Sequence, residues 1–387
     1  MKKQVGNVQL MQKINRLKVL NYIRENPSVS RLEITKKTGL SVASLTNITS
    51  YLLEKNLLLE DGVEEVSRVG RKTTLLKFNG DGYSLVCVSV LDSGIFLYHT
   101  NLCGKIMKEE SLTFDETNNI NVSDVLLNRL ADFLTSIDCT TVLGIGVFVS
   151  GVVLDDGHKV VSASLKWNEY DLVGAIQSIT YIPVFVDNVT QLKAISYYCT
   201  ERKEEHSNSV FVDMENGIGS VHFYQGALNR SFLGEIGHIT VDKDGLSCFC
   251  GNKGCLEMMC SAKRMIALYY EKTGQKISIS LLQQQAEAGE QAACEVIDSC
   301  AEYLGMTLAN MVNLLAPKEL VFDAGDFREC PRLIHKALQV MNERAYQTLV
   351  QDVTALTVTL SGEEMLVGMS ANLCNRIFDI NFENHII

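Results

Sequence analysis

The sequence lacks any apolar run that approaches the roughly 18 residues a membrane-spanning helix needs, and its first residues do not resemble a secretory signal peptide. We therefore expect a cytoplasmic protein with no membrane partner. A disordered or fibrous protein is also excluded, because 46% of the residues are hydrophobic and only 21% are charged. The 387 residues are enough for two or three domains with a sizeable core.

Disulfide bonds are not expected, although the sequence contains 12 cysteines. Most of them stand singly among apolar residues, which is typical of buried thiols in a reducing compartment. The exception is a group of four within thirteen residues, namely Cys248, Cys250, Cys255 and Cys260. This group needs a separate explanation.

The net charge of −11 disfavours nucleic acid as a partner, but it is unevenly distributed. Residues 1–79 contain 14 basic and 7 acidic side chains, a balance of +7. The other 308 residues contain 21 basic and 39 acidic side chains, a balance of −18. A basic head on an acidic body is typical of a DNA-binding module joined to a domain of another kind.

The sequence of the basic head predicts two helices, and a glycine ends the second of them. Apolar residues at three-residue spacing predict a first helix that ends before Pro27, and these residues are Ile14, Leu17, Leu20 and Ile23. Ser30 and Glu33 have the spacing of a capping box, which predicts the start of a second helix. Gly39 is placed to end that helix, because glycine adopts the left-handed conformation at little cost.

A third helix is predicted over residues 42–55, with Ser41 as its cap and an apolar face of Leu45, Ile48 and Leu52. Two short helices joined by a glycine-containing turn are typical of a helix-turn-helix, whose second helix enters the major groove. The residues expected to contact bases or phosphates there are Val42, Ala43, Ser44, Thr46 and Asn47. Since residues 42–54 contain no Arg or Lys, bidentate guanine contacts are not expected from this helix.

A β-hairpin wing is predicted after the third helix. Strand-like runs at 57–60 and 74–78 flank a polar tract, whose basic tip can enter a minor groove or lie along phosphates. The side chains expected to bind the DNA backbone are Lys36, Lys37, Arg71 and Lys72. The alternative is a helical protein-interaction module with a solvated basic face.

From Gly82 onward, short apolar runs alternate with helical stretches, which indicates an α/β fold. The expected strands are 83–90, 142–150, 183–186, 209–213 and 319–323. The expected helices are 123–137, 190–200, 262–273 and 291–315. Glycine-rich turns follow two of the strand regions, at Gly144–Gly151 and Gly217–Gly219, where glycine permits either close approach to a ligand or an ordinary tight turn.

The strongest local pattern spans residues 234–257. Three cysteines in the spacing Cys-x-Cys-x4-Cys, with a histidine ten residues upstream, can supply four tetrahedral ligands to Zn²⁺. The alternative is a set of reduced structural thiols that includes Cys260. Glu235 and Glu257 flank the cluster, and they are either a hydroxyl-binding array for a polyol or sugar or ordinary solvated carboxylates.

This stretch resembles the signature of the ROK family (repressors, open reading frames, kinases). The family's Gly-Glu-x-Gly-His is present at 234–238, and its Cys-x-Cys-Gly-x-x-Gly-Cys-x-Glu is present at 248–257. The segments Gly144–Gly151 and Ser164–Trp167 are also similar to family elements, although Ser164 replaces an Asn. The resemblance implies an α/β fold with an N-terminal winged helix-turn-helix and a two-lobed actin-like/hexokinase-like (ROK, ribonuclease H-like) body.

The resemblance also implies site residues. The expected ligands of a structural Zn²⁺ are His238, Cys248, Cys250 and Cys255. The expected sugar contacts are Gly151, Asn188, Glu235, His238 and Glu257, so that His238 would bind zinc through one ring nitrogen and sugar through the other.

The kinases of this family carry the catalytic base within Val-Glu-Asn-Asp. The matching stretch here ends in Asn188 and Val189, and an alkyl side chain cannot accept a proton. Asp187 could replace the base only from roughly 6–7 Å away along an extended strand. No catalytic residue is therefore expected.

The phosphate-binding turns of the family's kinases are also altered. The segments 88–94, 215–219 and 323–326 lack glycines that the kinases have, and carboxylates stand nearby. Because such turns hold phosphates through backbone N–H groups, we expect ATP binding to be lost.

These expectations combine into a sugar-responsive DNA-binding regulator of carbohydrate-metabolism genes, for which we expect repression while the sequence leaves activation open. A sugar kinase and a regulator that senses a partner protein or a phosphosugar are the alternatives. The expected domains are a head at 1–79, a first lobe at 80–195 and a second lobe at 196–387, with the C-terminal helix returning to the first lobe. The expected partners are an operator in double-stranded DNA, a sugar and further copies of the chain, as a homodimer or homotetramer.

Overall fold

The computed structural model describes residues 2–64, 73–114, 120–154, 157–162, 164–201, 208–215, 217–229, 231–382 and 386–387. Internal contacts divide the chain into two compact units, Met1–Asp187 with Leu366–Ile387 and Asn188–Met365. The domain limits expected at residues 79 and 195 stay predictions. Within the described ranges, no helix is both long enough and apolar enough to cross a membrane.

The first unit begins with three helices and a small antiparallel sheet. The helices are α1 (Lys2–Glu25), α2 (Arg31–Thr38) and α3 (Val42–Glu54), and the strands are β1 (Val29–Ser30), β2 (Leu58–Glu64) and β3 (Thr73–Phe78) in the order β1-β3-β2. The predicted capping box is confirmed, since Ser30 and Glu33 each accept a hydrogen bond from the other's backbone N–H. Gly39 ends α2 with a φ of 72°. This segment is a winged helix-turn-helix head.

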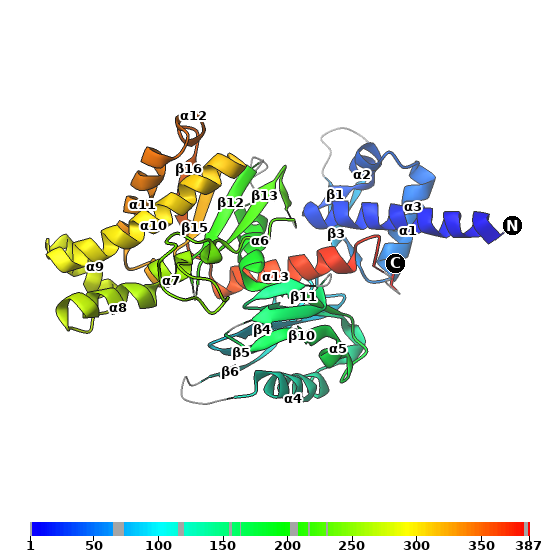
Figure 1. Ribbon diagram of the computed structural model, residues 1–387. Coiled ribbons are helices and arrows are strands. Elements are labelled where there is room, and N and C mark those ends of the chain that lie inside the picture. The colour runs from blue at the N-terminus through cyan, green and yellow to red at the C-terminus, as the bar shows by residue number, and fades with distance from the viewer. Residues whose placement is uncertain are drawn as a thin grey trace. The chain divides into compact units, whose positions relative to one another are not determined.

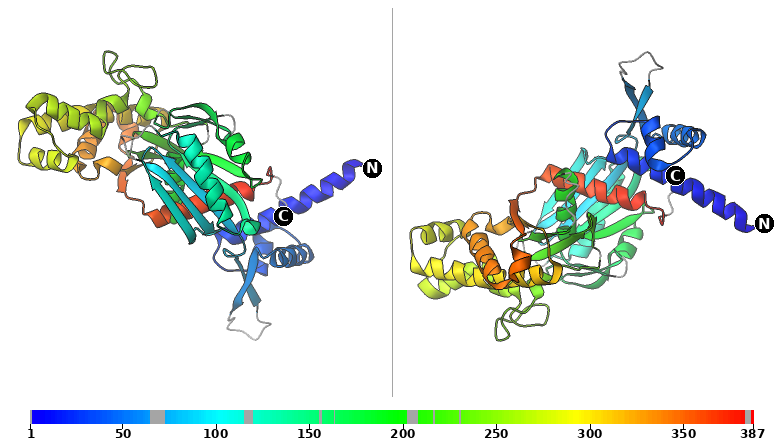
Figure 2. Two further views of the ribbon diagram at one scale, coloured as in Figure 1. Left: turned by 90° about the horizontal axis from the view of Figure 1, so that it is seen from below. Right: turned by 90° about the horizontal axis from the view of Figure 1, so that it is seen from above.

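The core of the head is formed by residues from all of its helices and strands. Its fully buried members include Leu20, Ile23, Ile34, Leu45, Leu52, Leu57 and Leu76. Ile48, which was expected to face inward, is only partly buried, and Thr49 next to it is fully buried. The N-terminal half of α1 extends beyond this core in every view (Figures 1 and 2).

The head also packs against residues from the far end of the chain. Asn21 of α1 donates a hydrogen bond to the carbonyl of Phe378 (3.3 Å), and Lys13 donates one to the carbonyl of Phe382 (2.6 Å). The rings of Phe78 and Phe378 meet edge to face, with centroids 6.5 Å apart. The first unit is therefore completed by residues that follow the whole of the second unit in sequence.

The rest of the first unit is built on a five-stranded sheet in the order β11-β7-β4-β5-β6. Its strands are β4 (Ser84–Leu91), β5 (Gly94–Asn101), β6 (Ile106–Thr113), β7 (Val142–Val149) and β11 (Val184–Asn188). The helix α4 (Val122–Thr135) covers one face and α13 (Gly362–Ile377) the other (Figures 1 and 2). Gly146 of β7 allows this packing, because a Cβ there would lie 2.7 Å from the side chain of Leu373.

Smaller elements follow β7. The strands β8 (Val152–Leu154), β9 (Lys159–Ser162) and β10 (Trp167–Asp171) form a three-stranded sheet, and α5 (Leu172–Gln177) leads back toward β11. Leu165 and Trp167 are buried in the same core as the sheet and α4.

The second unit has its own five-stranded sheet, in the order β14-β13-β12-β15-β16. Its strands are β12 (Asn208–Asp213), β13 (Gly219–Tyr224), β14 (Ala227–Leu228), β15 (Glu319–Asp323) and β16 (Thr354–Val358). Its helices are α6 (Val189–Glu201), α7 (Leu256–Cys260), α8 (Ala262–Thr273), α9 (Ile279–Glu287), α10 (Gln291–Leu315), α11 (Pro331–Arg344) and α12 (Gln347–Val350).

Alternating side chains of β12 pack into two separate apolar clusters, one on each face of the second sheet. Val210 and Val212 pack in a large cluster with α10 and α11, whereas Phe211 packs with Ala194 and Tyr197 of α6 on the opposite face. Because successive side chains of a strand point to opposite faces, a continuous apolar run fits a sheet covered on both sides. The predicted α/β architecture is confirmed in both units.

Candidate functional site

The residues expected to read DNA form an exposed surface on α3. The side chains of Val42, Ala43, Ser44, Thr46 and Asn47 are all exposed, and 70% of the surface of Val42 is accessible. Such exposure of an apolar residue at the start of a helix fits contact with a thymine methyl. The hydroxyl of Thr46 donates to the carbonyl of Val42 (2.8 Å) and so stays close to the helix.

A groove between α1 and α3 adds polar residues that the sequence did not indicate. It has a volume of about 210 Å³ and is lined by Gln12, Asn15, Arg16, Ser44, Asn47 and Ile48. The guanidinium of Arg16 lies over the ring of Tyr51, 3.6 Å from its centroid. Three α1 residues therefore lie beside two of the predicted reading residues, which no local spacing in the sequence could have revealed.

The predicted phosphate contacts fall into two groups. Lys36 and Lys37 are exposed at the end of α2. Arg71 and Lys72, expected at the tip of the wing, lie outside the described residues, so their contribution stays a prediction.

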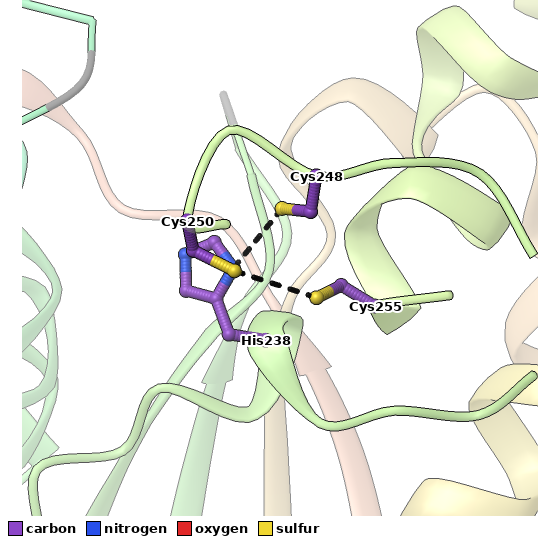
Figure 3. Close-up of side chains that lie close together, drawn as sticks. All are labelled: His238, Cys248, Cys250 and Cys255. Carbon is purple, nitrogen blue, oxygen red and sulfur yellow. Dashed lines mark hydrogen bonds between the residues drawn. The ribbon is translucent and has the colours of Figure 1, made fainter. Parts of the chain in front are cut away.

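The predicted metal ligands converge in the second unit (Figure 3). One ligand atom from each of His238, Cys248, Cys250 and Cys255 lies within 4.8 Å of all the others. The Sγ atoms of Cys250 and Cys255 are 3.6 Å apart, and Sγ of Cys248 is 3.6 Å from Nδ1 of His238. Tetrahedral zinc with Zn–S bonds of about 2.3 Å places ligand atoms about 3.8 Å apart, so both the donor set and its size fit Zn²⁺.

The fourth nearby thiol is not part of this cluster. Cys260 is fully buried at the end of α7 and lies in the same core cluster as Cys300 of α10, whose thiol donates to the carbonyl of Met259. It therefore belongs to the core of the second unit.

The pKa values of two thiols in the cluster shift in opposite directions. Burial raises the pKa of Cys255 to about 12, whereas the backbone of Asn252 lowers the pKa of the exposed Cys250. Because zinc binds thiolates, a metal ion at this cluster must displace protons, and its affinity must fall at acidic pH.

The two glutamates of the motif approach the same histidine. Nδ1 of His238 faces Cys248, while its Nε2 lies 4.0 Å from the carboxylate of Glu235. Loss of hydration raises the pKa of Glu235, and the neighbouring charge of Glu257 raises it further. Burial likewise raises the pKa of Glu257. Two partly dehydrated carboxylates are therefore available to accept hydrogen bonds from hydroxyl groups, and with Nδ1 on a metal the Nε2–H of His238 would be a donor.

The peptide group of Ile218 connects the two halves of the motif. Its backbone lowers the pKa of Glu257, and its carbonyl accepts a 2.9 Å hydrogen bond from the N–H of Gly237. Gly237 lies in the short 3-10 helix η3 (Ile236–His238), which follows Glu235 directly. Gly217 lies against the same carboxylate, because a Cβ there would be 3.1 Å from Oε2 of Glu257.

The other two predicted sugar contacts have structural roles of their own. Gly151, in the first unit, has a φ of 138°, and a Cβ there would lie 2.4 Å from the carbonyl of Val161. Asn188 starts the second unit, and its side-chain oxygen accepts a 2.6 Å hydrogen bond from the N–H of Thr190 at the start of α6. Sugar binding by either residue stays a prediction.

The stretch that matches the catalytic base of the kinases lies at the junction of β11 and α6. Val189 is the first residue of α6. The carboxylate of Asp187 is buried and accepts hydrogen bonds from Asn372 and Arg376 of α13, each 2.8 Å long. Asp187 therefore anchors α13 to the end of β11.

Comparison with known proteins gives matches for both parts of the chain. The ROK family matches residues 93–374, and a winged helix-turn-helix DNA-binding family matches residues 13–58. The xylose repressor of Bacillus spizizenii is 26% identical over 387 residues, which cover 97% of this chain and 99% of the repressor. The N-acetylglucosamine repressor of Escherichia coli O157:H7 is 26% identical over 353 residues, 87% of this chain and 86% of the repressor.

A solved structure has the same fold. It is the crystal structure of a ROK family transcriptional regulator, a homologue of the E. coli MLC protein. Its TM-score is 0.78 at 24% sequence identity, and the match covers 93% of this chain and 95% of that one.

Proposed function

We propose, on the premise that this chain belongs to the ROK family, that it is a DNA-binding transcriptional repressor of carbohydrate-metabolism genes with a sugar as its effector. The observation that carries this proposal is the presence of two sites in one chain. The head exposes the reading residues of α3, and the second unit brings Glu235, His238 and Glu257 together beside a metal cluster. Full-length relatives that are named repressors support the same function.

Zinc is the metal that we assign to the cluster of His238, Cys248, Cys250 and Cys255. Four nitrogen and sulfur ligands with no open position are typical of a structural site. When bound, zinc would fix the loop and the orientation of the His238 ring. Nε2 of that ring would then face the effector together with Glu235.

The sugar would be held through its hydroxyl groups. Carboxylates of Glu235 and Glu257 accept hydrogen bonds from hydroxyls, and charged acceptors make the stronger hydrogen bonds. Gly151 and Asn188 are the further contacts that we assign to the effector from the family resemblance.

A non-catalytic body is part of the proposal. Val189 offers no proton acceptor at the position of the kinase base, and Asp187 is held in its ion pair with Arg376. At the first altered phosphate turn, Leu91 pairs directly with Gly94 in a tight hairpin between β4 and β5. These observations support regulation without phosphoryl transfer.

The effector would act by shifting a population of conformations. The sugar must bind the conformation that has low operator affinity more tightly than it binds the conformation that has high operator affinity. The coupling free energy between two such sites is typically about 1–3 kcal/mol. Two heads in a homodimer would bind two half-sites, so a change in their spacing would alter operator affinity.

The experiment that tests this function uses the purified full chain with its metal retained. Thermal shift is measured with monosaccharides, amino sugars and their phosphates. DNA binding is measured by anisotropy on a duplex selected by the protein from a random pool. We expect at least one free sugar to raise Tm and to weaken DNA binding about 5–150-fold.

Other results would point to the alternatives. A shift with phosphorylated sugars alone, or with none of the compounds, would favour a regulator of phosphosugars or of a partner protein. Sugar-dependent consumption of ATP in a coupled assay would instead identify a kinase.

A further inference from the structure

A buried lysine in the second unit is surrounded by three carboxylates. Nζ of Lys193, on α6, lies 2.7 Å from Asp213, 2.6 Å from Glu215 and 3.2 Å from Asp323. The side chains of Lys193, Asp213 and Asp323 are 8%, 5% and 7% exposed, whereas 48% of the Glu215 side chain is exposed. Burial alone would lower the pKa of Lys193, but the three carboxylates outweigh it and raise that pKa, so the lysine is charged.

The three carboxylates lie at the carboxyl ends of two neighbouring parallel strands. Asp213 ends β12 and Asp323 ends β15, and the two residues are paired in the sheet. The loops that follow touch each other, since a Cβ on Gly325 would lie 2.5 Å from Cβ of Glu215. Ligands of α/β proteins bind at this edge of the sheet, but here the position is taken by an ammonium group of the protein itself.

The first of these loops leads directly to the effector carboxylates. It begins at Asp213 and Glu215, which Lys193 holds, and it enters β13 at Gly219. The backbone of Ile218, just before β13, lowers the pKa of Glu257, and its carbonyl accepts a hydrogen bond from the N–H of Gly237. Glu215, one of the partners of Lys193, and Ile218 are three positions apart in the sequence, so the ion pairs of Lys193 lie close along the chain to the Ile218 peptide.

We propose that Lys193 is a built-in cation that holds Asp213 and Glu215 and thereby positions the Ile218 peptide, three residues further along the chain, against Glu257 and Gly237. Lys193 is a positioning residue, because it acts on the effector carboxylate through this loop. The importance of Glu257 for the effector rests on the proposed function, whereas the link from Lys193 to Ile218 does not.

The physical reason is the balance of charge. Without the ammonium, the two buried aspartates and Glu215 would repel one another, and the loops after β12 and β15 would separate. One ligand oxygen from each of the three carboxylates lies within 4.8 Å of the others, so a hard divalent cation could replace the lost charge.

The test measures hydrogen exchange of the Ile218 and Gly237 amides in the full chain. Lys193→Met keeps the apolar stem and removes the charge. We expect both amides to exchange at least about tenfold faster than in the wild type, because removing one partner of a buried ion pair loosens the structure around it. Millimolar Ca²⁺ should slow this exchange again in the variant and leave the wild type unchanged.

Two further variants complete the experiment. Lys318→Met removes an exposed lysine that pairs with Asp352 (3.1 Å) just before β15, at the opposite end of that strand, and should leave both amides unchanged. Glu215→Gln removes only the half-exposed partner and should accelerate exchange in the same direction by a smaller factor. If Lys193→Met does not fold, Glu215→Gln decides the question.

Unchanged exchange at Ile218 and Gly237 in the folded variants would overturn the proposal, as would a failure of Ca²⁺ to act on Lys193→Met. The exchange rates are measured without a sugar. An absence of any sugar effector would therefore count against the proposed function and leave this result standing.

Discussion

His238 directs its two ring nitrogens at different groups. Nδ1 faces the thiols and Nε2 faces Glu235, so a metal bound on one side fixes the ring on the other. One side chain thus links the metal cluster to the proposed effector contacts. A structural metal at this cluster would therefore act on the proposed effector site only through the orientation of this ring.

Cys250→Ser should abolish zinc binding, because an exposed loop with three ligands loses most of its affinity and its closed tetrahedral set. Elemental analysis of the purified variant measures the metal, and thermal shift with the effector measures the response. Cys103→Ser, which changes an exposed cysteine of the first unit, is the matched control. Retention of both zinc and the sugar response by Cys250→Ser would show that the cluster is not a metal site.

Glu257→Gln should separate stability from effector binding. Burial raises the pKa of Glu257, so the folded protein binds this proton more tightly than the unfolded chain does. The ionised carboxylate therefore costs stability, and this cost is absent below the unfolded pKa and grows as the pH rises through the folded pKa. At pH 7, Gln should raise Tm by about 2 °C, the shift that somewhat less than 1 kcal/mol produces in a domain of this size.

The increase in Tm caused by Glu257→Gln should shrink as the pH is lowered toward 5, whereas the response to sugar should be lost at every pH. Thermal unfolding from pH 5 to pH 8 measures the increase in Tm, and Tm with added sugar measures the response. Glu271→Gln, at an exposed glutamate paired with Arg264 on α8, should change neither. A lower Tm of Glu257→Gln at pH 7 would contradict the argument.

At the scale of elements, we expect α1 to extend the DNA-binding surface beyond the helix-turn-helix. Gln12, Asn15 and Arg16 border the groove that also contains Ser44 and Asn47. Long polar side chains beside a reading helix are placed to bind the phosphates that flank the contacted bases. We therefore expect the helix that precedes the motif to belong to the DNA interface as well as to the core of the head.

Arg16→Ala should weaken DNA binding about tenfold at moderate salt and lower the slope of log K against log salt by about 1. The physical reason is the loss of one phosphate contact, which affects all DNA sequences alike. Anisotropy titrations over a range of salt concentrations measure both effects. Lys318→Ala, far from the head in sequence and exposed, serves as the control, and an unchanged salt slope in Arg16→Ala would place α1 outside the interface.

Local patterns predicted the elements whose determinants are close together in sequence. The capping box at Ser30 and Glu33, and the helices α8 and α10, were predicted at their observed positions. The convergence of His238 and the three cysteines was predictable for the same reason, since all four residues come from one short stretch.

Contacts between distant segments could not be predicted in this way. Lys193 is one polar residue in a helical pattern, and its three partners come from β12, β15 and the loop after β12. The groove residues of α1 acquire their neighbours only when α1 packs on α3. Ile48 was misjudged because the apolar period of α3 does not show which side is covered.

At the scale of the whole molecule, the first unit is discontinuous. It comprises residues 1–187 and 366–387, and the second unit is one uninterrupted segment between them. Leu373 of α13 packs on Gly146 of the first sheet, and Phe378 packs on Phe78 of the head. The two pieces of the first unit therefore depend on each other.

This arrangement sets an order for folding on the ribosome. Residues 188–365 contain every strand of the second sheet, so that unit can close as soon as it has emerged. The head and the first sheet emerge earlier, yet they must wait for α13 and for the residues that bind Lys13 and Asn21. A nascent chain thus carries an incompletely supported DNA-binding head until α13 and the residues after it have been translated. The unit that is synthesised first is the last to be finished.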